Sequence, residues 1–317
     1  MKTQTAYPFE EQVVFPEKKN IPELVARKGL PNQQVFDFIG SLFKASSTIV
    51  IDDKNVVSDV LVKPNCTCAI SQSNKRHLET FGMPTDYVEP NQLLIKSLGF
   101  PLEECKQWVY AKKLKMFPLD FIVSGYDEHG DKSKLANPQV VCTCKTGLKI
   151  SRDQAITVLA EWFNNNGYCF KEYKQLLGCE PHKHTTFYDV AAEYMNALDA
   201  FCEDIYSLLH KKYEAAGVLL VKTKLSIGFE EDNFCLAGEV GTPDTSVLAS
   251  KSLYEKTGIL ESFDKMPLMK YLEKVAYNGG EGIEIPKVPD DVMIQLCDIY
   301  VYMATALSDE QMIQIYM

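Results

Sequence analysis

The sequence predicts a mixed α+β (α/β) fold, because strand-like and helix-like segments follow one another along the chain. Apolar and polar residues alternate between 47 and 62 on both sides of a polar turn at 52–55, which favours an antiparallel hairpin. Residues 187–216 instead carry apolar side chains at helical spacing, and Gly217 follows as a stop. A strand pattern at 218–227 comes directly after this helix. We therefore expect sheet and helix to build the same fold.

Signals at segment ends define the remaining elements. Ser151 can cap a helix and Gln154 stands at the reciprocal capping-box position, so a helix is expected from there to about residue 164. Prolines and scattered charges before residue 33 indicate an extended arm with one short helix at 21–28. The other predictions are strands at 117–123, 140–144 and 234–240, a charged turn at 229–233, a helix at 266–276, a glycine- and proline-containing loop at 279–289 and a final helix at 290–307.

Length and composition favour a packed protein of two domains. The chain has 317 residues, of which 46% are hydrophobic and 24% charged, and this balance is typical of globular proteins rather than of disordered segments. We expect an N-terminal arm at 1–32, a β-rich N-terminal lobe at 33–115 and an α+β C-terminal lobe at 116–317.

Charge and targeting signals exclude some classes of partner. A formal net charge of −10 opposes binding to nucleic acid or to anionic lipid. No apolar run approaches the roughly 20 residues that span a bilayer, and the first residues show no signal-peptide pattern. We therefore expect a cytoplasmic protein with no nucleic-acid or membrane partner. Its ten cysteines are expected to be mostly buried free thiols.

One segment combines several side chains that can bind a metal. Cys179, His182 and His184 fall close together, and thiol and imidazole groups suit soft or borderline metals. No fourth ligand is evident beside them, so a polar loop before the long helix is the preferred interpretation. The Cys-Thr-Cys sequences at 66–68 and 142–144 have a shorter gap than ordinary zinc sites.

The hairpin after the long helix carries the most informative motif. Residues 219–228 read LLVKTKLSIG and residues 236–246 read LAGEVGTPDTS. This order resembles the SAICAR synthetase family, whose hairpin reads D-x-K-x-E-F-G and then D-E-I-x-T-P-D-S-S-R. Three other segments are similar to the family's F-P-V-E-x-I-V-R-G-Y, P-T-T-K and S-F-D-K: FPLDFIVSGY at 117–126, CTCK at 142–145 and SFDK at 262–265. The resemblance spans residues 33–307 and is strongest after residue 115.

The resemblance implies a diverged member of a family of ATP-dependent ligases of purine biosynthesis. Such enzymes join a carboxyaminoimidazole ribotide to aspartate through an acyl phosphate. The resemblance also implies a two-lobed fold in which ATP binds in a cleft like that of ATP-grasp enzymes or kinases. It further implies ATP and Mg²⁺ as cofactors and a homo-oligomeric assembly. The chemistry needs carboxylates that hold Mg²⁺ and cationic side chains that bind phosphates.

Several charged positions of the family motifs have changed in this sequence. The two metal-binding carboxylates fall at Ser226 and Gly238, and two phosphate-binding arginines fall at Ser124 and Val247. The acid of D-x-K becomes Lys222. Serine and glycine cannot bind Mg²⁺ through a charged side chain, and valine cannot replace a bidentate guanidinium.

The residues that survive at motif positions form the candidate site. By the resemblance, Glu239 and Asp244 are candidate catalytic residues, Lys145 and Lys224 are candidates for nucleotide binding, and Asp244, Thr245, Ser246 and Lys265 are candidates for substrate binding. Each also has a purely structural interpretation, since the Pro-Asp-Thr turn can bond nearby backbone amides and the other charges can be solvated. Their joint survival favours recognition of an anionic ligand, such as a nucleotide.

Three functional hypotheses follow, and we rank them in this order. The first is a pseudoenzyme that binds a nucleotide or another anionic ligand, with ligase activity lost or much reduced. The second is an active amide-forming ligase in which Glu239, Asp244 or Glu230 serves a rearranged metal site. The third is ordinary SAICAR synthesis. Removing a carboxylate from a Mg²⁺ site costs orders of magnitude in rate, and this sets the ranking.

Overall fold

The computed structural model describes residues 45–52, 55–56, 62–88, 109–127, 133–166, 186–230, 233–260, 262, 266–276, 286 and 288–309. The predicted arm, most of the loop at 279–289, the cluster of Cys179, His182 and His184, and Lys265 lie outside these residues. No helix in the described ranges is long and apolar enough to cross a membrane.

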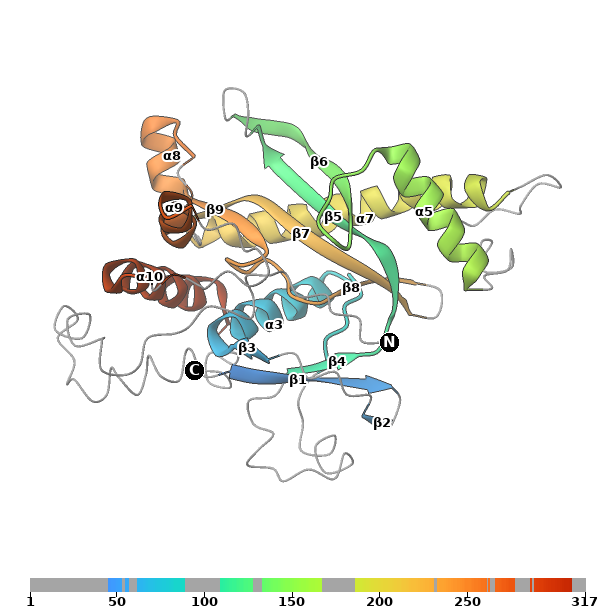
Figure 1. Ribbon diagram of the computed structural model, residues 1–317, viewed down its shortest axis with the longest axis horizontal. Coiled ribbons are helices and arrows are strands. Elements are labelled where there is room, and N and C mark those ends of the chain that lie inside the picture. The colour runs from blue at the N-terminus through green and yellow to red at the C-terminus, as the bar shows by residue number, and fades with distance from the viewer. Residues whose placement is uncertain are drawn as a thin grey trace.

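An antiparallel sheet, five-stranded within the described residues, forms the centre of the fold (Figure 1). Its strands lie in the order β6 (Lys134–Cys144), β5 (Lys115–Tyr126) and β7 (Val218–Glu230). The far edge of β7 is shared, because β9 (Ser246–Ser250) pairs with its first half and β8 (Asn233–Ala237) with its second. The predicted strands of this region are confirmed, although β5, β6 and β7 are longer than expected and the strand expected at 234–240 ends at Ala237. Residues 229, 230 and 233 of the expected turn lie in β7 and β8.

Two helices cover one face of the central sheet, as Figure 1 shows. They are α5 (Arg152–Asn165) and α7 (Phe187–Ala215), close to their predicted bounds. The expected capping box is confirmed: the Ser151 hydroxyl accepts from the Gln154 amide, and the Gln154 side chain accepts from the Ser151 amide. Alternate residues of β5 and β7 pack against these helices in the hydrophobic core, among them Phe117, Leu119, Phe121, Val123, Leu225 and Ile227.

A smaller sheet precedes the central one in the chain. β1 (Ala45–Asp52) pairs antiparallel with β2 (Asn55–Val56) and with β3 (Val62–Pro64), and parallel with β4 (Val109–Lys112). The predicted hairpin is therefore confirmed, although its second strand is short. Helix α3 (Asn65–Thr80), which the sequence did not predict, follows β3 directly.

A short extended segment at 84–87 connects the two sheets. Asp86 donates its amide to Leu236 of β8 at 2.8 Å, and its carbonyl accepts the Lys112 amide of β4 at 2.8 Å. Asp86 is therefore bonded through its backbone to both sheets.

The C-terminal part of the chain adds three helices in the described ranges: α8 (Lys251–Thr257), α9 (Met266–Lys274) and α10 (Asp290–Leu307). α10 packs beside α3 (Figure 1). The predicted helices at 266–276 and 290–307 are confirmed, and the fold is mixed α+β as predicted.

Candidate functional site

The face of the central sheet opposite α5 and α7 carries the candidate residue Lys224 of β7 and two changed motif positions. Lys222, Lys224 and Ser226 alternate along this strand with core residues, and all three are partly exposed. On the neighbouring strand β5, Asp120 is the Cα partner of Ser226. Because cross-strand partners project to the same side, Asp120 lies on this polar face as well.

Asp120 connects two of the positions that the sequence singled out. The Ser226 hydroxyl donates to Asp120 Oδ1 at 2.7 Å, and Lys145 Nζ lies 2.5 Å from the same oxygen. The Asp120 side chain is 6% exposed, whereas that of Lys145 is 30% exposed. Lys145, which follows β6, is therefore brought to the same face as Lys224. Asp120 was not among the predicted site residues, although it stands in the FPLD segment where the family has F-P-V-E.

A second carboxylate lies at the other position where the family has a metal ligand. Asp86 Oδ2 accepts the Gly238 amide at 3.0 Å, and Asp86 Oδ1 forms an ion pair of 2.6 Å with Lys75 of α3. The Lys75 and Asp86 side chains are 3% and 7% exposed. Gly238 itself adopts φ +73°, and this left-handed conformation ends β8.

Helices α3 and α7 hold the loop that follows β8. The Val240 amide donates to Ser71 Oγ at 3.1 Å, and Asn74 Nδ2 donates to the Val240 carbonyl at 2.9 Å. The Tyr213 hydroxyl donates to the Gly241 carbonyl. Gly241 has φ +68°, and a Cβ there would lie 2.5 Å from Tyr213 Oη and 2.7 Å from Asn74 Nδ2, so only glycine fits.

The same loop joins the predicted residues Glu239 and Thr245 to β7. Glu239 Oε1 accepts from the Thr242 hydroxyl, and the Thr242 amide donates to Thr245 Oγ1 at 3.2 Å. The Thr245 carbonyl in turn accepts the Lys224 amide at 2.9 Å. Glu239, Thr245 and Lys224 therefore belong to one bonded unit at the edge of β7.

Two other predicted residues have partners elsewhere. Asp244 Oδ1 accepts from the Tyr300 hydroxyl of α10. Ser246 is buried and donates to Thr223 Oγ1 at 2.9 Å, on the side of β7 that carries the core residues and opposite Lys224. The structure thus separates the Ser246 hydroxyl from the polar face.

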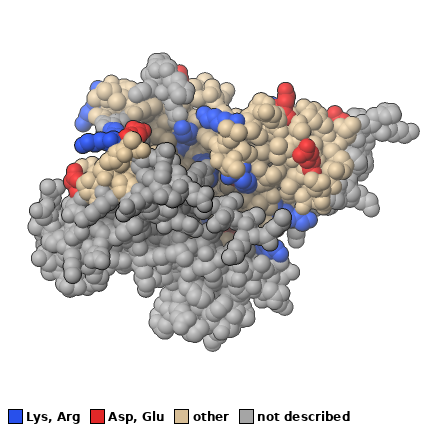
Figure 2. Space-filling model, in the orientation of Figure 1, with Lys and Arg blue, Asp and Glu red and all other residues tan. Residues whose placement is uncertain are grey.

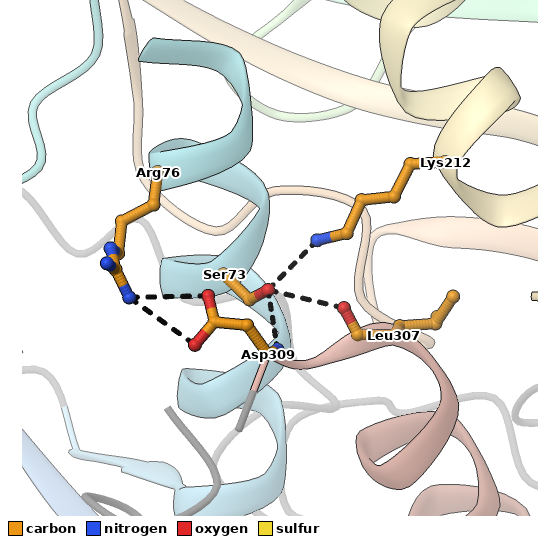
Figure 3. A network of polar contacts seen from close by, with 5 residues as sticks. All are labelled: Ser73, Arg76, Lys212, Leu307 and Asp309. Atoms are coloured by element: carbon orange, nitrogen blue, oxygen red, sulfur yellow. Dashed lines mark hydrogen bonds and ion pairs between the residues drawn. The ribbon is translucent and has the colours of Figure 1, made fainter. Parts of the chain in front are cut away.

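A polar network ties α7 and α10 to the α3 residues behind this loop (Figure 3). Lys212 Nζ donates to Ser73 Oγ at 2.9 Å and to Asn74 Oδ1 at 2.8 Å. Burial lowers the pKa of Lys212 to about 8, and the Asp309 carboxylate opposes this effect. Ser73 Oγ also donates to the Leu307 carbonyl at 3.3 Å and accepts the Asp309 amide at 2.9 Å. Asn74 is therefore bonded both to Lys212 and to the loop at Val240.

The surface charge of one face is uneven. In Figure 2, basic side chains of the described surface lie near its middle and also at its left end, where acidic side chains stand beside them. The basic side chains near the middle favour approach of an anion there despite the net negative charge of the chain.

Comparison with known proteins decides the family. The family model described as SAICAR synthetase matches residues 35–285. The chain belongs to the SAICAR synthetase family. Its curated relatives in this family carry the name phosphoribosylaminoimidazole-succinocarboxamide synthase. The Candida albicans protein is 24% identical over 63% of this chain and 66% of its own length, and the Nitrosopumilus maritimus protein is 22% identical over 82% and 89%. A third relative, from Syntrophotalea carbinolica, is matched over only 32% of its length.

Solved SAICAR synthases share the fold. The Saccharomyces cerevisiae enzyme, solved as a complex with SAICAR, aligns with a TM-score of 0.56 at 17% identity, over 77% of this chain and 81% of that one. A second SAICAR synthase structure aligns with a TM-score of 0.56 at 18% identity, over 82% and 85%. At these identities, the comparison establishes the architecture.

Proposed function

We propose that this member of the SAICAR synthetase family binds a nucleotide or another anionic ligand on the polar face of β5 and β7, with amide-forming ligation lost or much reduced. The proposal rests chiefly on the contact of Lys145 with Asp120 beside Ser226. At the position of Ser226 the family has a carboxylate that binds the metal ion. This chain instead has the Ser226 hydroxyl, and the neighbouring Asp120 carboxylate is already paired with Lys145.

The charges of this face support anion binding. Lys222 and Lys224 are partly exposed on it, and the partly exposed Lys145 reaches it from the end of β6. Ammonium groups bind phosphate oxygens as point charges with several donors each. These three lysines therefore bring several positively charged donors to one face of the sheet, where a phosphate-bearing ligand can bind.

Loss of ligation follows from the groups that are missing. Ser226 and Gly238 replace two metal carboxylates, and Ser124 and Val247 replace two arginines. Removing one preorganised electrostatic partner of a transition state typically costs about 2.7–4 kcal/mol, and several such losses leave little turnover although they do not add simply.

One observation favours the alternative of an active ATP-dependent ligase with a rearranged metal site. A carboxylate from a neighbouring segment lies against each altered position, Asp120 against Ser226 and Asp86 against Gly238. These two side chains, rather than Glu239, Asp244 or Glu230, would then be the recruited groups; Glu230 instead pairs with Lys112 at 3.2 Å. From the family resemblance we also propose that residues 33–115 and 116–317 form two lobes, that the ligand binds between these lobes, and that the protein assembles as a homo-oligomer. Light scattering after gel filtration tests the oligomer.

Titration with ATP and MgCl₂, followed by melting temperature, tests the binding proposal. A ligand that binds only the folded state stabilises it by about 2.7 kcal/mol at one hundred times its Kd. We expect a rise for the wild-type protein and a much smaller one for Lys224→Met. The matched control is Lys211→Met, which removes one exposed lysine of α7 and should behave as wild type. A flat wild-type response would refute binding of this nucleotide.

An activity assay separates the two functions. We expect no release of ADP at an ordinary enzymatic rate when the ribotide, aspartate and Mg-ATP are supplied together. Release that depends on both substrates would support the alternative of an active ligase.

A further inference from the structure

Asp120, the carboxylate beside the altered position Ser226, is paired with a lysine. Asp120 Oδ1 receives the Ser226 hydroxyl at 2.7 Å and the Lys145 ammonium at 2.5 Å. Mg²⁺ binds anionic or neutral oxygens at about 2.0–2.1 Å in octahedral geometry, so a metal on this oxygen must displace at least one of the two donors and would repel the ammonium group. The ammonium group already supplies the positive charge that a cation would bring.

A similar arrangement occurs at Gly238, the other altered position of a family metal ligand. Asp86 Oδ1 lies 2.6 Å from Lys75 Nζ, and Asp86 Oδ2 accepts the Gly238 amide at 3.0 Å. Both side chains are almost fully buried. Withdrawing Asp86 toward a metal would leave Lys75 as an uncompensated charge in the interior, which is strongly unfavourable.

The other acidic side chains of the region also have donors. Glu239 accepts from Thr242, and Asp244 accepts from Tyr300. Within the described ranges, no group of three or more His, Cys, Asp or Glu side chains has the arrangement to hold a metal ion. Because Asp120 and Asp86, the carboxylates at the two altered positions, are each paired with a lysine, the residues present do not fit the Mg²⁺ that the family implies.

We propose that this chain binds the phosphates of its ligand through lysine ammonium groups, without a divalent cation. The inference rests on the proposed nucleotide or anion binding. Lys145 is the central group, because its ammonium has three donors and can hold Asp120 and a phosphate oxygen together. Lys224 and Lys222, two and four residues before Ser226 on the same face, extend the positive charge along β7.

The proposal predicts how a cation changes affinity. Free ATP carries more negative charge than Mg-ATP, and lysines that act as the counter-charge interact more strongly with the more negative form. Binding should therefore be as tight in EDTA as in MgCl₂, or tighter. A site that needs a bridging metal shows the opposite order.

Calorimetric titration of the full chain with ATP, in EDTA and in excess MgCl₂ at equal ionic strength, tests this directly. We expect the Kd in EDTA to equal or fall below the Kd in MgCl₂. Binding seen only with MgCl₂ would overturn the metal-independent mode and leave the proposed binding function intact. Absence of binding in both buffers would overturn the metal-independent mode and refute binding of this nucleotide.

A variant and a metal probe sharpen the result. Lys145→Met should weaken ATP binding in EDTA at least tenfold and make the remaining binding depend on MgCl₂, because Asp120 then faces the phosphates without its counter-charge. Lys211→Met should change neither Kd. With MnCl₂ in place of MgCl₂, the electron paramagnetic resonance signal should report no more bound Mn²⁺ for wild type with ATP than for ATP alone. A protein-dependent loss of the free Mn²⁺ signal would contradict the proposal even if Lys145→Met failed to fold.

Discussion

Replacing Lys212 by methionine should change how the stability of the protein depends on pH. The Lys212 ammonium is largely buried between Ser73 and Asn74 of α3, with Asp309 as the nearby acidic group. Burial lowers its pKa from 10.5 to about 8 in the folded protein. The unfolded chain therefore binds the proton more tightly, and the free energy of unfolding rises with pH between 8 and 10.5. Below about pH 8, the free energy of unfolding is lowered by the full cost of burying the charged Lys212 ammonium.

The size of the effect follows from this difference in pKa. At about 1.4 kcal/mol per pKa unit, the lowering from 10.5 to about 8 corresponds to a penalty of about 3 kcal/mol at neutral pH. About 2 kcal/mol of this should disappear between pH 7 and 9.5. Methionine has a similar length and no charge, so the variant lacks this contribution. It also loses two hydrogen bonds, but that loss depends less on pH.

Urea unfolding of both proteins at several pH values between 7 and 9.5 measures the effect. The stability of wild type minus that of Lys212→Met should rise by about 2 kcal/mol across this range. Other titrating groups are shared by both proteins and cancel in the difference. Lys211→Met, its exposed neighbour, should show no such trend. A difference that stays constant with pH would refute the assignment of Lys212 as the buried titrating group.

Three other variants test single contacts. Asp86→Asn leaves Lys75 charged and buried without its partner, so urea unfolding should show a loss of about 3–5 kcal/mol. Tyr300→Phe removes the donor to Asp244 and should lower the free energy of unfolding by about 1.5–3 kcal/mol in urea, whereas an unchanged free energy would show that this bond does not stabilise the fold. Among the cysteines whose burial the structure describes, Cys68, Cys142, Cys202 and Cys235 are buried and Cys144 is not, and hydrogen bonds, chiefly from a neighbouring hydroxyl, lower the pKa of Cys144. A chromogenic disulfide reagent should therefore react with Cys144 before these four, and Cys144→Ser should remove that fast phase.

Periodicity and end signals predicted the elements that bury ordinary apolar faces. The long helix α7, the β7–β8 hairpin and the capping box of α5 all follow rules that a short window of sequence contains. Helix α3 was missed because its buried residues are largely polar, including Ser71, Ser73, Asn74 and Lys75. Their hydrogen-bond partners come from distant segments of the chain, so no local sequence pattern predicts that these side chains are buried.

The same reason limits the prediction of the site. Strand alternation and the motif order pointed to Lys224 and Lys145, and the structure places both on one face with Asp120 between Lys145 and Ser226. The pairing of Asp86 with Gly238 joins residues far apart in the chain, and no sequence window reveals it. The side to which Ser246 points depends on the register of β9 against β7, which motif order does not specify.

Asp86 has a mechanical role that its contacts define. Its amide is bonded to β8, its carbonyl to β4, and its carboxylate to the Gly238 amide and to Lys75. A displacement of the small sheet relative to the central one must therefore strain bonds of the residue that also holds the start of the loop after β8. A movement of one sheet relative to the other would thus be coupled to the shape of that loop through one residue, whose backbone bonds to both sheets and whose carboxylate holds the loop.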